Sequence, residues 1–245
     1  MVMQLEPGCL ILSEQRQGPV RVEFGAVSAL PWDDAIAAAR AVLSERARRG
    51  GTLDILLSES YYRLGLIKTS VEALDATELE TLARHHFRAV LGELCASCEF
   101  RVVPVPASAG MTGLLCCAID REGIEGFHRV AEASGCVIGS LAPRIAMLEA
   151  GLAAELVDFS GHLVLADREA AAIVALRAGA WTQVMTRRHG LATDWLAQAL
   201  GQAESLAGTG TRMAWLAGNV AATDVDGWQL RRLHQFDHRA RELGR

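Results

Sequence analysis

Cysteine is the residue type whose spacing in this sequence comes nearest to a metal or redox site. The chain has six cysteines, of which Cys95 and Cys98 form a Cys-Ala-Ser-Cys segment and Cys116 and Cys117 are adjacent. Two thiols separated by two residues could bind zinc or act as a redox dithiol. Neighbouring strand residues point to opposite faces, so at most one of Cys116 and Cys117 could join the first two.

Two histidine pairs bear on the question of a metal site, and one of them could in principle supply a further ligand. His234 and His238 lie four residues apart on an expected helix, but nothing in the sequence brings them near the cysteines. His85 and His86 are adjacent on another expected helix and point about 100° apart, so they cannot chelate one metal together. We therefore expect buried, reduced thiols and no metal site.

Other familiar catalytic and phosphate-binding patterns do not occur in the sequence. Lys68 is the only lysine, and it follows Leu66-Ile67, so a Gly-Lys-Ser/Thr phosphate loop is excluded. No nucleophile elbow, Ser-His-Asp order or pair of carboxylates at helical spacing stands out. The net charge of −5 argues against nucleic-acid binding, because phosphate contacts require a basic face. We assign no catalytic residue.

The N-terminus and the apolar segments predict a cytoplasmic protein. The first eight residues, Met-Val-Met-Gln-Leu-Glu-Pro-Gly, lack the charged start and apolar core of a signal peptide. The longest apolar stretch, at 113–119, is far shorter than the roughly 20 residues of a spanning helix. A chain of 245 residues with 51% hydrophobic content can bury a core without disulfides or a structural metal.

Hydrophobic periodicity and turn residues predict alternating strands and helices in the first half. Strands are expected at 9–12 and 20–24, at 53–58 and 61–68 as a second strand pair, and at 99–105, 112–119 and 136–141. Helices are expected from Asp33 towards Gly50, over 75–94, from Asp120 to Gly135 and from Pro143 to about 152. In the helix over 75–94, Thr77 and Glu80 fit a capping box.

The second half repeats this order of elements. Strands are expected at 156–158 with 161–166, at 170–177 and at 180–187, then a helix at 193–203, a strand at 213–216 and a helix from 226 onward. A strand meander followed by helix, strand and helix is typical of a ribonuclease H-like half-domain. Two such halves in tandem make the actin-like ATPase architecture, an α/β fold with mixed sheets and a nucleotide in the cleft between the halves. We place the halves at 1–148 and 149–245.

Several short patterns between residues 50 and 190 resemble one family of proteins. The patterns are a strand bearing Arg63, an Ala83-Arg84-x-x-Phe87 helix running to Gly92, a Cys-Ala-Ile-Asp step at 117–120, and a strand ending at Ser140-Leu-Ala-Pro143. In these respects the chain resembles the cytoplasmic part of GspL-type secretion proteins and the PilM-type pilus-assembly proteins. The resemblance implies the actin-like fold already indicated by the element order.

The resemblance also implies a place of action. It suggests a cytoplasmic platform component of a type IV pilus or a type II secretion machine, peripheral to the inner membrane at most. GspL-type chains continue into a transmembrane helix and a periplasmic domain, whereas this sequence ends in an arginine-rich segment and looks more like the free-standing PilM arrangement. In that arrangement the protein grips the short cytoplasmic tail of a membrane-spanning partner. The sequence does not decide whether the chain forms a homodimer.

The resemblance raises the question of a nucleotide site. Actin-like ATPases place an Asp-x-Gly turn in each half for phosphate and Mg²⁺ and a Gly-Gly turn after a late apolar strand for adenosine. The first half offers only Glu23-Phe24-Gly25 and Ser13-Glu14, and Asp158-Phe-Ser-Gly161 is one residue too long. If ATP with Mg²⁺ binds, the expected cofactor-binding residues are Asp158, Gly161, Gly218 and Asn219.

Two functional hypotheses follow. The first is a non-catalytic cytoplasmic scaffold that binds a membrane-protein tail or a neighbouring subunit, and the eroded glycine turns favour it. The alternative is a divergent actin-fold ATPase or kinase that binds ATP between the halves. Five arginines near the C-terminus could dock on a partner or a membrane surface or form a solvated face; they are Arg231, Arg232, Arg239, Arg241 and Arg245.

Overall fold

A computed structural model describes residues 1–14, 17–25, 31–47, 49–68, 74–108, 111–189, 194–220 and 224–233. Its first five-stranded sheet has the order β3-β2-β1-β4-β8. The strands are β1 (Val2–Glu6), β2 (Cys9–Glu14), β3 (Gln17–Glu23), β4 (Thr52–Leu57) and β8 (Val137–Pro143). Strands β1 to β3 form an antiparallel meander, and β1, β4 and β8 run parallel.

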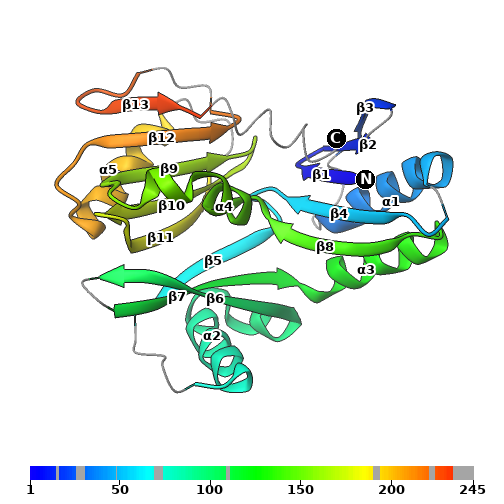
Figure 1. Ribbon diagram of the computed structural model, residues 1–245, viewed down its shortest axis with the longest axis horizontal. Coiled ribbons are helices and arrows are strands. Elements are labelled where there is room, and N and C mark those ends of the chain that lie inside the picture. Colours follow the sequence, from blue (N-terminus) through cyan, green and yellow to red (C-terminus); the bar gives the residue numbers. More distant parts are fainter. Residues whose placement is uncertain are drawn as a thin grey trace.

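A second five-stranded sheet repeats this topology, with the order β11-β10-β9-β12-β13. The strands are β9 (Gly161–Ala166), β10 (Ala170–Arg177), β11 (Ala180–Arg188), β12 (Met213–Gly218) and β13 (Gln229–Arg232). Again the first three form an antiparallel meander, and β9, β12 and β13 run parallel. Figure 1 shows the two sheets beside each other, with α4 between them. The predicted α/β architecture with mixed sheets is confirmed.

Helices cover the sheets. α1 (Pro31–Arg46) and α3 (Arg121–Ala133) pack on each other against the first sheet, α5 (Trp195–Ala207) packs on β10 and β11, and α4 (Arg144–Leu156) connects the two repeats. The contact between α1 and α3 is close, since a Cβ added at Gly123 would lie only 2.3 Å from the ring of Trp32. The absence of a side chain at Gly123 therefore allows this packing. Among the described helices, none combines the length and the apolar character that crossing a bilayer requires.

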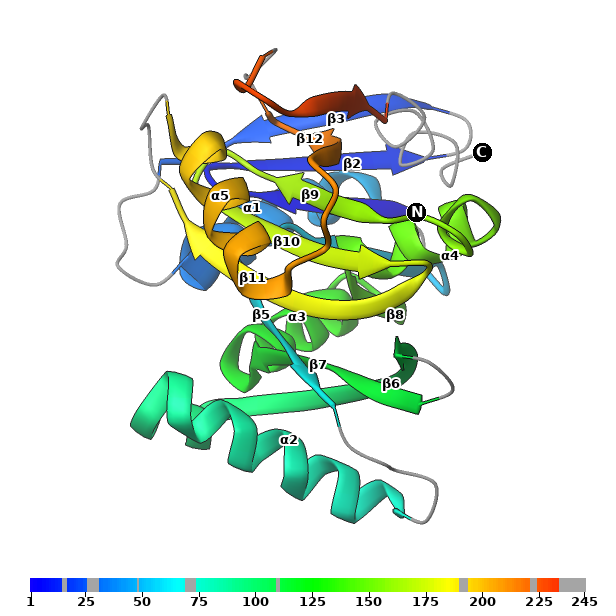
Figure 2. The same ribbon diagram turned by 90° about the vertical axis from the view of Figure 1, so that its left-hand side faces the viewer.

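An insertion between β4 and α3 adds a third layer. It contains β5 (Tyr62–Ile67), α2 (Ala76–Leu91), the short 3₁₀ helix η1 (Gly92–Ser97), β6 (Cys98–Ser108) and β7 (Met111–Asp120). Its sheet has the order β5-β7-β6, and Figure 2 shows α2 on the side of this sheet away from the two larger sheets. The expectation that the strands at 53–58 and 61–68 pair with each other was wrong. β4 has β1 and β8 on its two sides, so it has no free edge for β5.

Most of the other predicted elements are confirmed, with three corrections. β1 was not predicted from the sequence, because a strand at the very start of the chain has no preceding turn to mark its beginning. Residues 156–158 belong to the end of α4 and the following turn, not to a strand. The segment from 226 begins with a turn and continues as β13, not as a helix, and residues 234–245 lie outside the described residues.

The N-terminal caps of two helices can be compared with the predictions. The capping box of α2 uses Asp75 and Glu78 in place of Thr77 and Glu80, because the helix begins one residue after Asp75. Asp120 caps α3 as expected, by accepting a hydrogen bond from Glu122 N at 3.0 Å. The predicted division at 148/149 falls inside α4 and stays a prediction.

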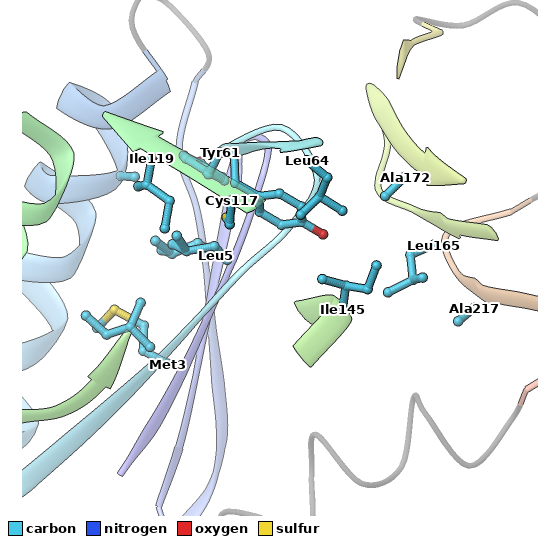
Figure 3. Packing of buried hydrophobic residues seen from close by; sticks show 14 of the residues in the cluster. Met3, Leu5, Tyr61, Leu64, Cys117, Ile119, Ile145, Leu165, Ala172 and Ala217 are labelled. Atoms are coloured by element: carbon cyan, nitrogen blue, oxygen red, sulfur yellow. The ribbon is translucent and has the colours of Figure 1, made fainter. Parts of the chain in front are cut away.

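One hydrophobic cluster runs through both repeats. Figure 3 shows Met3 and Leu5 of β1, Ile145 of α4, and Leu165 and Ala217 of the second sheet as parts of it. Each of these side chains is buried. Two smaller clusters lie on the outside, one under α5 and one between α2 and the inserted sheet. The two sheets therefore share a core at the place where they meet.

A buried histidine lies beneath the turn that follows α5. His162 of β9 is fully buried, and its Nε2 lies 3.6 Å from Oε2 of Glu204. Glu204 in turn accepts hydrogen bonds from Thr209 Oγ1 and Gly210 N. Burial lowers the pKa of His162 below its ordinary value of 6.5, although Glu204 acts in the opposite direction. The folded protein therefore disfavours the protonated form of His162.

We expect acid to destabilise the fold through His162. Below pH 6.5 the unfolded chain binds a proton that folded His162 disfavours, so the free energy of unfolding should fall by up to about 1.4 kcal/mol per pH unit. Urea unfolding at several pH values between 7.5 and 5.5 measures this slope. His162→Gln should flatten the slope, whereas the exposed control His85→Gln should not. Equal slopes in the wild type and His162→Gln would contradict the assignment.

Candidate functional site

The internal repeat brings equivalent turns together where the two sheets meet. The β1–β2 turn at 7–8 corresponds to the β9–β10 turn at 167–169, and the segment after β4 corresponds to the one after β12. Polar side chains from these places and from the start of α4 form a buried network, which we name the junction cluster. It consists of Glu6, Ser58, Glu59, Ser60, Arg144 and Asp167.

Asp167 joins the second repeat to the segment after β4. Its Oδ2 accepts hydrogen bonds from Ser58 Oγ and Ser60 N, both at 2.8 Å. Its Oδ1 accepts hydrogen bonds from the backbone N–H groups of Glu169 and Ala170, both at 2.7 Å. A carboxylate has about four lone-pair sites, and here four donors occupy them. The side chain is buried and is committed to holding the two repeats together.

Glu59 and Arg144 form an ion pair at the same junction. Nε of Arg144 donates to Glu59 Oε1 at 3.2 Å, and its Nη2 donates to Oε2. The same Nη2 donates to the carbonyl of Ala166, at the end of β9, at 2.9 Å. The Tyr62 hydroxyl donates to Glu59 Oε1 at 3.0 Å, and Oε1 of Glu6 lies 3.9 Å from Nη1 of Arg144. The pair therefore connects the first repeat to the strand that begins the second.

Burial sets the electrostatics of this pair. It raises the pKa of Glu59, against the opposing effect of the neighbouring guanidinium. Burial alone would lower the pKa of Arg144, but the charge and hydrogen bonds of Glu59 raise it above the ordinary value. Burial also raises the pKa of Tyr62, which keeps its hydroxyl protonated as a donor. The guanidinium thus only opposes the effect of burial on the pKa of Glu59, whereas the carboxylate overcomes it for Arg144, and removal of one partner leaves the other uncompensated.

Two of the four residues expected to bind nucleotide border the junction cluster. Gly218 ends β12 with φ +80°, and a Cβ there would lie 2.3 Å from the Ala166 carbonyl oxygen and 2.9 Å from Arg144 Nη2. Asn219 N donates to the same carbonyl at 2.7 Å. A residue with a side chain at position 218 would therefore disturb the junction.

The other two expected residues lie elsewhere. Asp158 is exposed in the turn after α4, and Gly161 begins β9, whereas the junction cluster lies beyond the other end of that strand. In the first half, Ser13 and Glu14 end β2, away from the β1–β2 turn. Glu23 ends β3, and Phe24 and Gly25 follow it; Phe24 N donates to Gly8 O at 3.0 Å. The structure therefore does not gather these residues into one site.

Two turns that the sheet topology places at the junction were not among the residues predicted from the sequence to bind nucleotide. They are Glu6-Pro7-Gly8 and Asp167-Arg168-Glu169, and in each an acidic residue ends or follows a strand and the chain reverses. The sequence does contain a pattern that indicates these turns, because each acid stands at the end of an apolar strand and a second strand follows. It was missed in the first half because β1 was missed.

The junction cluster does not fit a magnesium–nucleotide group. Glu6-Pro7-Gly8 keeps an acid and a glycine, but Glu6 faces Arg144. Asp167-Arg168-Glu169 has glutamate where an Asp-x-Gly turn has glycine, and backbone and hydroxyl donors already occupy the Asp167 oxygens. A bound phosphate needs close backbone N–H groups, and Mg²⁺ needs available carboxylate oxygens. The described residues instead place an internal ion pair between the turns.

The four cysteines that raised the question of a metal site are buried in two different places. Cys116 shares the cluster between α2 and the inserted sheet with Cys95 and Cys98, whereas Cys117 faces the main core, as the alternation along a strand predicts. Burial raises the pKa of Cys116 to about 12, which disfavours the reactive thiolate. Within the described ranges, no three His, Cys, Asp or Glu side chains are grouped to hold a metal ion. His234 and His238 lie outside those ranges.

We expect Arg144→Met to lower the free energy of unfolding by about 3–5 kcal/mol, because it leaves the buried Glu59 carboxylate without its cation. The double variant Glu59→Gln/Arg144→Met should lose less than the sum of the two single variants. Arg129→Met, which breaks an exposed pair with Glu125 at 3.7 Å, should cost no more than about 1 kcal/mol. Denaturant unfolding measures all four, and additive losses would contradict a coupled pair.

Comparisons with known proteins bear on the fold. No protein-family model and no curated protein sequence matches this chain. A chain of a solved PilM–PilN type IV pilus biogenesis complex matches with a TM-score of 0.71 and 14% identity, over 99% of this chain and 93% of that one. The cytoplasmic domain of EpsL, an inner membrane component of the type II secretion system of Vibrio cholerae, matches with a TM-score of 0.58 and 12% identity, over 99% and 94%.

A third solved structure is a Bacteroides thetaiotaomicron VPI-5482 protein of unknown function that is described as having an actin-like ATPase fold. It matches with a TM-score of 0.62 and 10% identity, over 98% of this chain and 93% of that one. At such identities the likeness is one of fold, and it agrees with the repeated sheet topology. The chain therefore has the actin-like ATPase fold, as its element order predicted.

Proposed function

We propose that this protein is a non-catalytic scaffold of a bacterial type IV pilus or type II secretion platform. The junction cluster carries the proposal, because Arg144, Glu59 and Asp167 fill with internal contacts the place that nucleotide phosphates would need. A fold without an open nucleotide site is suited to holding partners in place. In this role the chain binds the cytoplasmic tail of an inner-membrane protein or a neighbouring subunit.

The fold comparisons support the setting. One matched structure is a complex of two pilus proteins, and another is the cytoplasmic domain of an inner-membrane secretion component. Both cover nearly the whole of this chain, including the inserted third layer. By this analogy the protein acts at the cytoplasmic face of the inner membrane.

The first experiment asks whether nucleotide binds. We expect calorimetric titration of the protein with ATP or ADP in the presence of Mg²⁺ to give no binding heat up to millimolar nucleotide, with an EDTA-treated sample as the blank. The divergent ATPase or kinase would instead show micromolar binding that Asp167→Ala abolishes and the exposed control Asp158→Ala leaves intact. That result would overturn the non-catalytic proposal.

A second experiment tests the scaffold role itself. The chain is coexpressed with the tagged cytoplasmic tail of each single-span inner-membrane protein of the pilus and secretion systems of its own host. We expect one tail to copurify with the chain in a fixed stoichiometry, because a scaffold must hold its partner without turnover. A tail of the same length with a scrambled sequence is the control. Failure of every tail and of every neighbouring subunit to copurify would reject the scaffold role.

A further inference from the structure

A groove lies between the inserted sheet and the second five-stranded sheet. It has a volume of about 510 Å³, and β5 and β11 line it on opposite sides. Residues of α2 and α5 complete its rim. Figures 1 and 2 both show β5 passing beside β11 at the boundary of the two layers. This groove is separate from the junction cluster, since the residues that line it include none of the cluster.

Both walls of the groove are edge strands. Among the described strands, β5 pairs with β7 alone and β11 with β10 alone. At one point the two walls touch, where Leu64 N donates to Thr186 Oγ1 at 3.0 Å. Backbone groups alternate in direction along a strand, so the N–H of Leu66 faces the same side as that of Leu64. The Leu66 end of β5 therefore presents a strand edge to the groove.

The lining carries positive charge. Arg63 and Lys68 contribute to it, and none of the described lining residues is acidic. His86 also lines the groove, but burial and the nearby His85 lower its pKa and so favour its neutral form. The guanidinium of Arg63 donates to the carbonyls of Tyr62, at 2.8 Å, and of Ser60, so among the described residues it faces backbone oxygens in place of a carboxylate. Burial and the nearby charge of Arg188 lower the pKa of Arg63, so an anion placed here would be stabilised.

The rim of the groove is apolar and exposed. Val90 of α2 is 70% exposed, and Leu206 of α5 is 61% exposed. Both belong to the lining of the same groove. Large apolar side chains beside a strand edge, together with cations that face no carboxylate in the described part of the chain, are the features of a surface that binds a polypeptide segment.

We propose that this groove binds an extended segment of a partner protein that carries both acidic and apolar residues and adds as a strand to the Leu66 end of β5. This inference rests on the proposed scaffold function and names the chemistry of its partner. Arg63 and Lys68 are five positions apart, so the alternation along a strand places them on opposite faces of the added segment. A segment of alternating acidic and apolar residues therefore presents its carboxylates to Lys68 on one face and its apolar side chains to Val90 of α2 on the other.

Charge also argues against the C-terminal segment of this chain as the segment that fills the groove. Residues 234–245 contain three arginines and two acidic residues, so this segment has the wrong sign for a basic groove. A second copy of the chain would have to present an acidic strand of its own. The proposal therefore assigns the groove to a separate acidic polypeptide.

The test uses fluorescence anisotropy of the whole chain with a labelled decapeptide of alternating aspartate and valine. We expect saturable binding, and no binding of the matched peptide of alternating lysine and valine. Methylation of one central amide nitrogen of the aspartate peptide should weaken binding at least tenfold, because strand addition needs that donor. Equal binding of both peptides, no binding at millimolar protein, or no effect of methylation would overturn the proposal.

Matched variants locate the binding surface. Lys68→Glu and Val90→Asp should each raise the Kd at least tenfold. Arg129→Glu makes the same charge change on α3, and Val137→Asp makes the same apolar-to-acid change at a position that is 67% exposed on β8. Both controls should stay within twofold of the wild type. Equal losses in the controls and the groove variants would overturn the assignment of the groove.

Copurification of the partner tail with the groove variants distinguishes the scaffold proposal from the groove proposal. If Lys68→Glu and Val90→Asp abolish its copurification and the two controls do not, the groove is the tail site. If the tail still copurifies with both groove variants, the scaffold function stands and the groove assignment fails. Circular dichroism of each variant checks that the fold is retained.

Discussion

The buried ion pair between Glu59 and Arg144 is the interaction on which the arrangement of the two repeats depends. Folding removes both charges from water, and that cost is recovered only when each finds the other with the right geometry. The pair also positions Arg144 to reach the carbonyl of Ala166 in the second repeat. Asp167 strengthens the same connection from the opposite side by accepting hydrogen bonds from the segment after β4. The relative position of the sheets is thus specified by directional contacts in addition to a shared apolar core.

The same turns have different uses in different proteins of this fold. In an ATPase they must remain open to a ligand, with glycine backbone and carboxylates available. In this chain acids stand at positions 6 and 167, where an arginine and backbone donors inside the protein contact them. The architecture does not depend on how these turns are used, because the hydrophobic core that supports the sheets does not include them. The fold alone could not have indicated which of the two uses applies.

Much of the fold could be predicted from the sequence, because the pattern of apolar residues determines element type and order. The meander from β9 to β11 and the capped helix after Asp120 are clear examples. Strand pairing was harder, since whether β5 pairs with β4 or β7 depends on edges that only the assembled sheet defines. The site was harder still. Glu59 and Arg144 are 85 residues apart, and neither belongs to a local motif, so only the tertiary structure shows that they form a pair.

The unequal spacing within the two repeats has a consequence for the order in which the protein folds. In the second repeat, β12 and β13 pair across a short connection, with Met213 opposite Gln229. In the first repeat, the equivalent pairing of Thr52 with Val137 must wait until the whole insertion has been placed. Loop closure over a long segment is entropically costly, so sheets with distant partners form slowly. The second sheet should therefore form as an early nucleus, although the ribosome synthesises it after the first.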